Sequence, residues 1–493
     1  MFKGTIVQYF HWYIPNDGNL WNNLKADAPK LKSLGFSAVW LPPACKCADG
    51  INGTGYDIYD LFDLGEFDQK GSVKTKFGSK DEYIEAIKAI HDHQMQAMVD
   101  VVLNHKAGGD ELEKITVVRV NPDNRKEAVS EPFEIEAYTK FTFPGRNKKY
   151  SEYIWDSKCF TGVDKAKGID GNGIFRILNN NGENWQDMIY DENGNYDFLM
   201  FNDIDFRNES VRGELNYWGK WYYDQVHFDG VRLDAVKHMP YWFYNEWLDE
   251  LRKNTGQEIF AVAEFWSPGE TELLVKYLEA TNGRVSLFDA TLQQNFHHAS
   301  RQGKDFDISK IFDDTLVKIH PEKTVTVVSN HDTQPLQALE APVEVWFKPI
   351  AYSLILLRDG GYPCVFYPDL YGGHYKDKDK QGNEQEIWLQ KTENIEKLLQ
   401  VRCDHAYGIQ RDYFDHPNCI GWTREGDDEH SGCAVLISTG DEGNKNMEAG
   451  KRYAGRIFFD ALGKRNEEVT INEDGWGNFF SPAGSLSVWI EKI

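Results

Sequence analysis

The stretch that decides the fold is Gln96-Ala97-Met98-Val99-Asp100-Val101-Val102-Leu103, an almost unbroken apolar run. Such a run is typical of a strand buried on both faces of a parallel sheet. Outward from it, seven further strand-like runs occupy residues 5–9, 38–41, 228–233, 259–263, 285–288, 324–328 and 363–367. Helical segments are expected at residues 20–34, 81–91, 211–223, 241–254, 271–281 and 349–357. Eight strands alternating with helices favour a (β/α)8 TIM barrel over an open sheet.

Two parts of the chain break this rhythm. Residues 104–206 are rich in Gly, Asn, Asp and charged residues, with short β-like pieces such as Thr139–Phe143, and indicate an inserted, irregular β-rich domain. Beyond about Val401, runs separated by Gly and Asp turns are typical of an antiparallel β-sandwich, at residues 419–423, 433–438, 456–460, 468–472 and 485–490. The expected organisation is barrel (1–103), inserted domain (104–206), barrel (207–400) and C-terminal β-sandwich (401–493).

The composition narrows the class of protein. With 493 residues, 41% hydrophobic and 27% charged, the chain can bury a large globular core. The net charge is −24 and no Lys/Arg block occurs, which argues against a nucleic-acid partner. Aromatic residues make up 14% of the chain. They serve either core packing or the stacking of sugar rings, and composition alone does not choose between the two.

The cysteines and the apolar runs bear on the cellular compartment. Seven cysteines, an odd number without a Cys-x-x-Cys pair, indicate reduced thiols rather than structural zinc, and Cys45 and Cys47 are expected to be inert. Met1–Phe10 is too short and too polar for a signal peptide. No run approaches the roughly 20 apolar residues of a membrane span. We therefore expect a cytoplasmic protein that does not bind membranes, and a monomer.

Carboxylates follow three different strands of the predicted barrel. In TIM barrels the functional residues lie at the carboxyl ends of the strands. The fourth strand ends at Asp234, the fifth at Glu264 and the seventh runs into Asn330-His331-Asp332. One such carboxylate is most simply a helix cap or a solvated loop residue. Three of them, each beside a His, Arg or Trp, are expected to converge on one site.

Paired carboxylates at this position point to glycoside hydrolysis. Retaining glycosidases use one carboxylate as nucleophile and a second carboxyl group, about 5 Å away, as acid and base. Glu264 lies between Ala263 and Phe265-Trp266, an apolar setting that raises the pKa of an acid. Arg232 and Asp234 share one strand face, so the guanidinium is expected to keep the aspartate ionised as a nucleophile.

These segments resemble the four signature regions of glycoside hydrolase family 13, the α-amylase family. They are Asp100–His105, Gly230–Asp234, Glu264 and Asn330–Asp332. Gln8–Tyr13, Trp40–Pro43 and Gly55–Leu61 resemble the bacterial liquefying branch of that family. Phe206–Asn208, His331–Gln337 and Phe366–Tyr371 resemble its cytoplasmic members. The resemblance covers essentially the whole chain, and it implies the layout of domains described above.

The resemblance also implies roles for individual residues. Asp234 would be the nucleophile, Glu264 the general acid and base, and Asp332 the stabiliser of an oxocarbenium-like state. Around the sugar to be cleaved it places Tyr56, His105, Arg232 and His331, and on the leaving-group side Lys237 and His238. Family position favours sugar stacking for Trp12, Tyr13 and Trp266, whereas His11 and His374 are expected to be structural. Trp422, Trp476 and Trp489 are expected in the core of the β-sandwich.

A calcium site is the cofactor that the resemblance implies. Calcium prefers six to eight oxygen ligands. Asn104, Asp197, Asp203 and the backbone carbonyl of His238 match a calcium site of the family, which ties the inserted domain to the barrel. Some liquefying relatives hold a larger metal cluster. This chain has Thr161 and Gln186 where those relatives carry Asp, so we expect one structural calcium ion.

Three functions remain open at this point. The first is endo-acting hydrolysis of α-1,4 bonds in starch, glycogen or maltodextrin with retention of configuration. The second is a maltooligosaccharide-trimming or transglycosylating enzyme, because water or a sugar hydroxyl can attack the same glycosyl-enzyme. The third is a catalytically silent glucan-binding protein, which requires the loss of a carboxylate. None of the three carboxylates is lost in this sequence.

Overall fold

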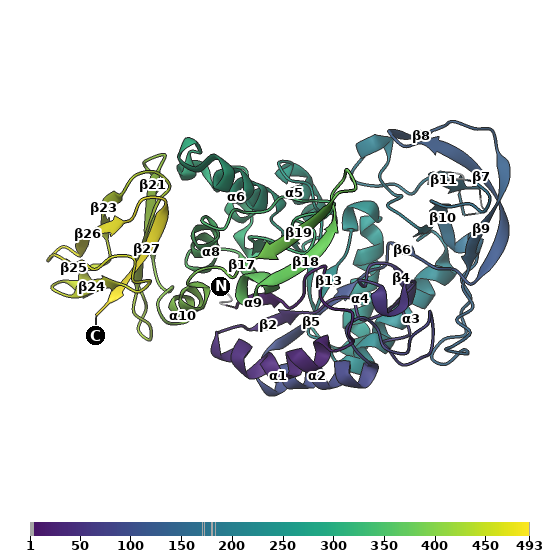
Figure 1. Cartoon of the computed structure of the whole chain (residues 1–493), viewed down its shortest axis with the longest axis horizontal. Helices are drawn as coiled ribbons and strands as arrows, with labels where there is room; N and C mark the ends of the chain where they lie inside the picture. Colours follow the sequence, from purple (N-terminus) through teal and green to yellow (C-terminus); the bar gives the residue numbers. More distant parts are fainter. Residues whose placement is uncertain (1–3, 170, 172, 179–180, 183, 493) are drawn as a thin grey trace.

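The computed structural model describes residues 4–169, 171, 173–178, 181–182 and 184–492. Eight parallel strands close into a barrel at its centre, which confirms the predicted fold class (Figure 1). Around the barrel the strands follow the order β1-β2-β5-β13-β14-β15-β16-β17. Their bounds are Ile6–Gln8, Ala38–Trp40, Gln96–Val101, Gly230–Leu233, Phe260–Ala263, Ser286–Phe288, Thr324–Val327 and Tyr362–Phe366. Each strand lies inside its predicted run or shifts by one residue.

Helices surround the barrel. The six predicted ones are present as α1 (Leu20–Ser33), α2 (Lys80–Asp92), α3 (Glu209–Val226), α4 (Tyr241–Thr255), α5 (Thr271–Ala280) and α8 (Lys348–Leu356). Ser79 begins α2 with a capping box, in which Ser79 and Glu82 satisfy each other's backbone amides. Four further helices were not predicted, which are α6 (Ala290–Gln302), α7 (Leu316–Ile319), α9 (Tyr367–Tyr371) and α10 (Ile395–Asp404).

Between β5 and α3 the chain forms a separate antiparallel sheet, at the opposite end of the molecule from the C-terminal strands (Figure 1). Its strands are β6 (His105–Lys106), β7 (Glu111–Asn121), β8 (Asn124–Ala128), β9 (Phe133–Lys140), β10 (Phe160–Val163), β11 (Phe175–Ile177) and β12 (Asn202–Ile204). The strand expected at Thr139–Phe143 was misplaced: in the structure it runs from Phe133 to Lys140 and pairs with β7. Nearer the barrel, β3 (Lys46–Cys47) pairs with β4 (Ile58–Asp60).

A hairpin follows the last barrel strand. Its strands, β18 (Gly373–Lys378) and β19 (Glu384–Leu389), pair antiparallel with His374 opposite Trp388. Most side chains of β18 are exposed, and Tyr375 is the buried exception. The sequence analysis did not predict this hairpin, because its charged residues hide the alternation that marks a half-buried strand.

The C-terminal part is a two-sheet antiparallel structure, as predicted. One sheet has the order β20-β21-β22-β27-β24-β25, and the other pairs β23 with β26. The strands are β20 (Gln410–Tyr413), β21 (Cys419–Arg424), β22 (Cys433–Ser438), β23 (Gly443–Glu448), β24 (Ile457–Asp460), β25 (Glu468–Thr470), β26 (Trp476–Ser481) and β27 (Ser485–Glu491). Trp422 and Trp489 are fully buried, which confirms their place in its core, whereas Trp476 is only half-buried.

Two further properties concern the chain as a whole. No helix within the described residues combines the length and the apolar character that a membrane crossing requires. All seven cysteines lie in the described part of the chain, and no disulfide joins any two of them. Cys45 and Cys47 are buried, and burial raises the pKa of the Cys45 thiol, so the reactive thiolate form is disfavoured.

Candidate active site

Arg232 lies at the centre of a buried charge cluster at the carboxyl ends of the strands. One terminal guanidinium nitrogen donates to Asp100 Oδ1 (2.8 Å) and to Asp234 Oδ1 (2.6 Å). The other donates to Glu264 Oε2 (2.6 Å). Asp100, Asp234 and Glu264 come from three adjacent strands, β5, β13 and β14, whose register places Arg232 beside Asp100. A single cation therefore brings together the two carboxylates that the sequence analysis assigned to chemistry.

The barrel backbone fixes these side chains. The amide of Asp234 donates to Val101 O (3.0 Å), and the amide of Glu264 donates to Leu233 O (2.9 Å). Each carboxylate therefore follows the last ladder hydrogen bond of its strand. The next residue, Ala235, has a positive φ of 49° and donates its amide to Glu264 Oε2 (3.1 Å). The sharp turn after β13 thus holds Asp234 and Glu264 by backbone geometry as well as by charge.

Burial shifts the pKa of every carboxyl group in the cluster. Desolvation raises the pKa of Asp234 to about 6, against the opposing effect of Arg232. It also raises the pKa of Glu264, and the negative charge of Asp234 adds to that rise. The pKa of Asp332 is raised further, first by burial and then by repulsion from Glu264. Arg232 therefore lowers the pKa of Asp234 as expected, but its charge is shared among three carboxylates and does not restore the ordinary value.

Aromatic rings and His331 form one wall of the site. The rings of Trp12, Tyr56 and His331 lie nearly parallel to one another, and the Tyr56 centroid is 5.6 Å from that of Trp12 and 5.0 Å from that of His331. His331 Nε2 lies 3.3 Å from Asp332 Oδ2, and its other ring nitrogen contacts Gln8 Nε2 at 3.0 Å. Burial holds the pKa of His331 well below its usual range, so the ring is neutral at pH 7. The Nε2 of a neutral imidazole with Nδ1 accepting is a hydrogen-bond donor.

Tyr56 and His105 are linked to the same cluster. The Tyr56 hydroxyl donates to Asp100 Oδ2 (2.9 Å), and His105 Nε2 donates to the backbone carbonyl of Tyr56 (2.7 Å). Burial lowers the pKa of His105 to about 4, so it too is neutral at pH 7. These contacts set the position of the Tyr56 ring against the carboxylates.

A second wall carries Lys237, His238 and Trp266. Lys237 Nζ donates to the backbone carbonyl of Trp266 (3.1 Å) and lies over the rings of Tyr190 and Tyr196, 5.2 and 5.1 Å from their centroids. His238 Nδ1 donates to the carbonyl of Tyr196 (2.8 Å), and burial lowers its pKa to about 3. This wall therefore joins the turn after β13 to the 190–200 segment of the inserted region.

Nine of the ten predicted catalytic and substrate-binding residues line a single cavity of about 440 Å³, and Arg232 is the exception. Arg232 lies beneath them and is buried. Tyr13 is not among the residues that line this cavity, and one face of its ring packs on Tyr375 at a centroid distance of 3.8 Å. The sequence analysis missed the lining residues of two loops, which are Tyr196, Leu199, Met200, Gln337, Ala338 and Leu339. The apolar triplet Phe198–Met200 in a polar lobe was the one available signal.

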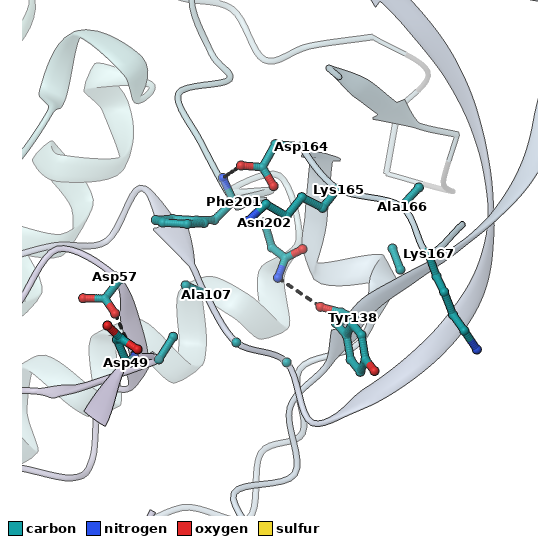
Figure 2. A pocket seen from close by; sticks show the side chains of 14 residues that line it. Asp49, Asp57, Ala107, Tyr138, Asp164, Lys165, Ala166, Lys167, Phe201 and Asn202 are labelled. Atoms are coloured by element: carbon teal, nitrogen blue, oxygen red, sulfur yellow. Dashed lines mark hydrogen bonds between the residues drawn. The ribbon is translucent and has the colours of Figure 1, made fainter. Parts of the chain in front are cut away.

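A second cavity, of about 560 Å³, adjoins the first. Phe201 lines it, and its ring contacts His105 of the first cavity at a centroid distance of 5.4 Å. Figure 2 shows Phe201 and Tyr138 among its lining residues, with Asn202 donating to the Tyr138 carbonyl (3.2 Å). Tyr138 is 55% exposed. Phe201 therefore stands between the two cavities, and the second one is lined in part by residues of the inserted sheet.

The predicted calcium ligands are buried and short of positive charge. Asn104, Asp197 and Asp203 are each at most 1% exposed. Burial raises the pKa of Asp197 to about 8, and burial together with repulsion from Asp197 raises that of Asp203 further. Within the described chain, no Lys, Arg or His forms an ion pair with either carboxylate, and Asn104 Oδ1 is buried without a hydrogen-bond partner. Two adjacent buried carboxyl groups and an unsatisfied amide oxygen fit a cation, whose charge would lower both pKa values.

The neighbouring residues limit how many metal ions fit. Thr161 Oγ1 donates to Asp203, and Gln186 Nε2 donates to Asp197 Oδ1 (3.0 Å). Both positions therefore supply hydrogen atoms to the carboxylates. Among the described residues no group of three or more His, Cys, Asp or Glu side chains is arranged to hold a metal ion. The candidate set depends on two carboxylates, an amide oxygen and backbone carbonyls.

The comparisons with known proteins agree on one family. Residues 26–425 match the model "Alpha amylase, catalytic domain", and residues 435–490 match "Alpha-amylase C-terminal". The chain is 49% identical to the cytoplasmic alpha-amylase of Escherichia coli (strain K12), over 99% of this chain and 98% of that protein. It is 46% identical to an alpha-amylase of Geobacillus stearothermophilus, over 100% of this chain and 87% of that protein.

Two other similarities bear on activity and fold. The chain is 45% identical to the glucan 1,4-alpha-maltohexaosidase of Bacillus sp. (strain 707), over 99% of this chain and 93% of that protein. Among solved structures, an Anoxybacillus alpha-amylase matches with a TM-score of 0.63 at 17% identity, over 99% of this chain and 98% of that one. Taken with the closed barrel and its carboxylates, these matches show that the chain is a glycoside hydrolase that belongs to the α-amylase family.

Proposed function

We propose that this chain hydrolyses internal α-1,4-glucosidic bonds of a glucan, with retention of configuration by double displacement. The observation that carries the proposal is the Arg232 guanidinium, whose two terminal nitrogens hold Asp234 and Glu264 at 2.6 Å each. Two carboxyl groups that share one guanidinium are held close together, which favours the short separation of retaining enzymes over the wider one that admits the water of an inverting enzyme.

The protonation states give each carboxyl group its role. With its pKa at about 6, Asp234 is mostly ionised at pH 7 and is the nucleophile. Glu264 has a raised pKa, and the backbone amide of Ala235, in the turn after Asp234, holds its carboxyl group in place. Glu264 is therefore the proton donor to the leaving oxygen. Water then attacks the glycosyl-enzyme while Glu264 takes a proton back. Asp332 and the neutral His331 beside it hold the hydroxyl groups of the sugar, and the positive charge that develops on the sugar lowers the pKa of Asp332, whose carboxylate then stabilises it.

The walls of the site position the glucan. Trp12 and Tyr56 present parallel rings to one sugar, and His105, Lys237, His238 and Trp266 supply the remaining contacts. Endo action is supported by the second cavity beyond Phe201, because a chain that extends past the carboxylates has a surface to lie on. A maltooligosaccharide-trimming enzyme is the second candidate, favoured by the similarity to a maltohexaosidase.

The test is a time course of products from a long linear glucan. An endo enzyme lowers the mean chain length of the polymer before short sugars accumulate. A trimming enzyme releases short sugars of one size from the start, and a transglycosylating enzyme makes products longer than a short donor. A chain that binds glucan without releasing reducing ends is a silent binder, which would overturn the proposal.

We also propose one structural calcium ion, held by Asn104, Asp197, Asp203 and the carbonyl of His238. The ion supplies positive charge between two carboxylates that form no ion pair with any described Lys, Arg or His. Its ligands come from the end of β5, the inserted region and the turn after β13, so it ties together the segments that carry His105 and Lys237. The similarity to a cytoplasmic enzyme supports action in the cytoplasm, and we take the chain to act as a monomer.

A further inference from the structure

The hairpin β18–β19 carries an exposed tryptophan at the rim of the barrel. Trp388 is 67% exposed, more than any other large apolar side chain of the described residues. Its ring stacks on that of His374, its cross-strand partner, with a centroid distance of 3.8 Å and an interplanar angle of 25°. His374 Nε2 in turn donates to Glu386 Oε1 (2.8 Å). The indole is therefore supported from beneath while most of its surface faces water.

The opposite face of the hairpin anchors it to the barrel. The Tyr375 ring stacks on Tyr13 at 3.8 Å, and the Tyr375 hydroxyl donates to Pro335 O (2.7 Å). The Tyr13 hydroxyl donates to Asp377 Oδ2 (2.5 Å). Because side chains alternate along a strand, these contacts fix the inner face and leave His374 and Trp388 on the outer one. The indole is thus preorganised, and binding a ligand there requires little further ordering.

The hairpin lies next to the active site. It follows β17 and α9, so it leaves the barrel from the same carboxyl ends that carry the catalytic carboxylates (Figure 1). Gln337 lines the active-site cavity and donates to the Tyr13 hydroxyl (2.7 Å), which joins the cavity wall to the hairpin. A smaller cavity of about 220 Å³ separates the hairpin from the 334–348 segment, and Trp388 and Gln334 both line it.

The chemistry of this surface favours a neutral polyhydroxylated ligand. On the outer face the indole has Lys376 and Glu386 as neighbours, whose charged groups lie 3.9 Å apart. A flat ring among polar groups that donate and accept hydrogen bonds suits the C–H face and the hydroxyl groups of a sugar. A protein partner requires a wider apolar patch. A polyanion is disfavoured by the net charge of −24.

We propose that Trp388, stacked on His374, is an accessory binding site for an α-glucan chain, separate from the catalytic cavity. This inference rests on the proposed function for the identity of the sugar. A polymer held at the hairpin stays close to the carboxylates between cleavage events. The site therefore acts on long substrates and leaves oligosaccharides that fill only the catalytic cavity unaffected.

The experiment compares Trp388→Ala with Phe459→Ala, a control that removes another exposed aromatic ring, on β24. Binding is measured by affinity electrophoresis in native gels that contain amylopectin. Both substitutions are placed in a Glu264→Gln background to keep the polymer intact. We expect Trp388→Ala to weaken retention at least about threefold, the size of effect that one aromatic stacking contact gives. Phe459→Ala should leave retention unchanged, and the thermal midpoint should stay the same in both variants.

The same substitutions in the active enzyme separate this site from the catalytic cavity. With a short chromogenic maltotrioside, kcat/KM of Trp388→Ala should equal that of the parent. Unchanged retention in amylopectin would overturn the proposal. So would an equal loss of kcat/KM on the maltotrioside, or a change in molecular mass in solution with retention unchanged, which would assign Trp388 to contact with a second copy. If the parent released no reducing ends from starch, the proposed function would fail, whereas the retention assay would still report on Trp388.

Discussion

Replacing Asp234 with asparagine is expected to stabilise the protein at neutral pH while removing its activity. Burial raises the pKa of Asp234 from 3.8 to about 6. The folded state therefore binds more protons than the unfolded state between these values, so stability falls as pH rises through them. A difference of about 2 pH units corresponds to about 3 kcal/mol at pH 7, at 1.36 kcal/mol per unit. Asparagine has the shape of the protonated side chain and no charge to desolvate.

The assay is the thermal midpoint of parent and Asp234→Asn at pH 4 and at pH 7.5. The variant should melt above the parent at pH 7.5, and the difference should shrink at pH 4, where the parent carboxyl is protonated. Asp249→Asn is the matched control, because the hydrogen bond from Arg284 lowers the pKa of Asp249. Asp249→Asn should lower the thermal midpoint at pH 7.5, and the effect should become smaller as the pH falls. A lower midpoint for Asp234→Asn at both pH values would refute the argument from desolvation.

Three other predictions concern catalysis and the metal. Asp234→Asn and Glu264→Gln should each lower kcat on starch by at least about 10³-fold, because each removes a chemical participant. The control, Glu272→Gln at an exposed position, should leave kcat unchanged. Near-normal turnover in either site variant would refute the role of that residue. The pH profile of kcat/KM should fall on the acid side near pH 6, where Asp234 gains its proton, and on the alkaline side where Glu264 loses its own, and a profile flat from pH 4 to 7 would contradict the roles. Chelation should lower the thermal midpoint of the parent, because an ion that binds only the folded state stabilises it. The effect should be smaller for Asp203→Asn, which lacks one of the proposed ligands. An unchanged parent midpoint, or more than one tightly bound ion per chain, would contradict a single calcium site.

The barrel could be predicted because its strands are buried on both faces. Runs such as Gln96–Leu103 carry almost no polar residue, so their identity does not depend on the rest of the chain. The site could be predicted for the same reason, since Asp234 and Glu264 directly follow such runs. What the sequence did not reveal was the sharing of Arg232 among three carboxylates. That arrangement depends on the register of β5, β13 and β14.

The missed features depend on contacts between distant parts of the chain. The contact between Tyr13 and Tyr375 could not be predicted, because Tyr375 lies 362 positions away on a hairpin whose charged strands give no alternating pattern. Helix α6, Ala290–Gln302, is mostly polar and follows a short strand, so periodicity alone did not separate it from a loop. The cavity residues Tyr196 and Gln337 lie on loops, where neither periodicity nor strand position marks function.

The most direct test of the double displacement at Asp234 and Glu264 is the anomeric configuration of the first product. Proton NMR, recorded within the first seconds of hydrolysis of a maltooligosaccharide and before mutarotation, distinguishes the two anomers of the new reducing end. Double displacement with Asp234 as nucleophile and Glu264 as acid and base, both held by Arg232, inverts the configuration twice and so retains it. The account predicts that the α-anomer forms first. The β-anomer as the initial product would contradict it.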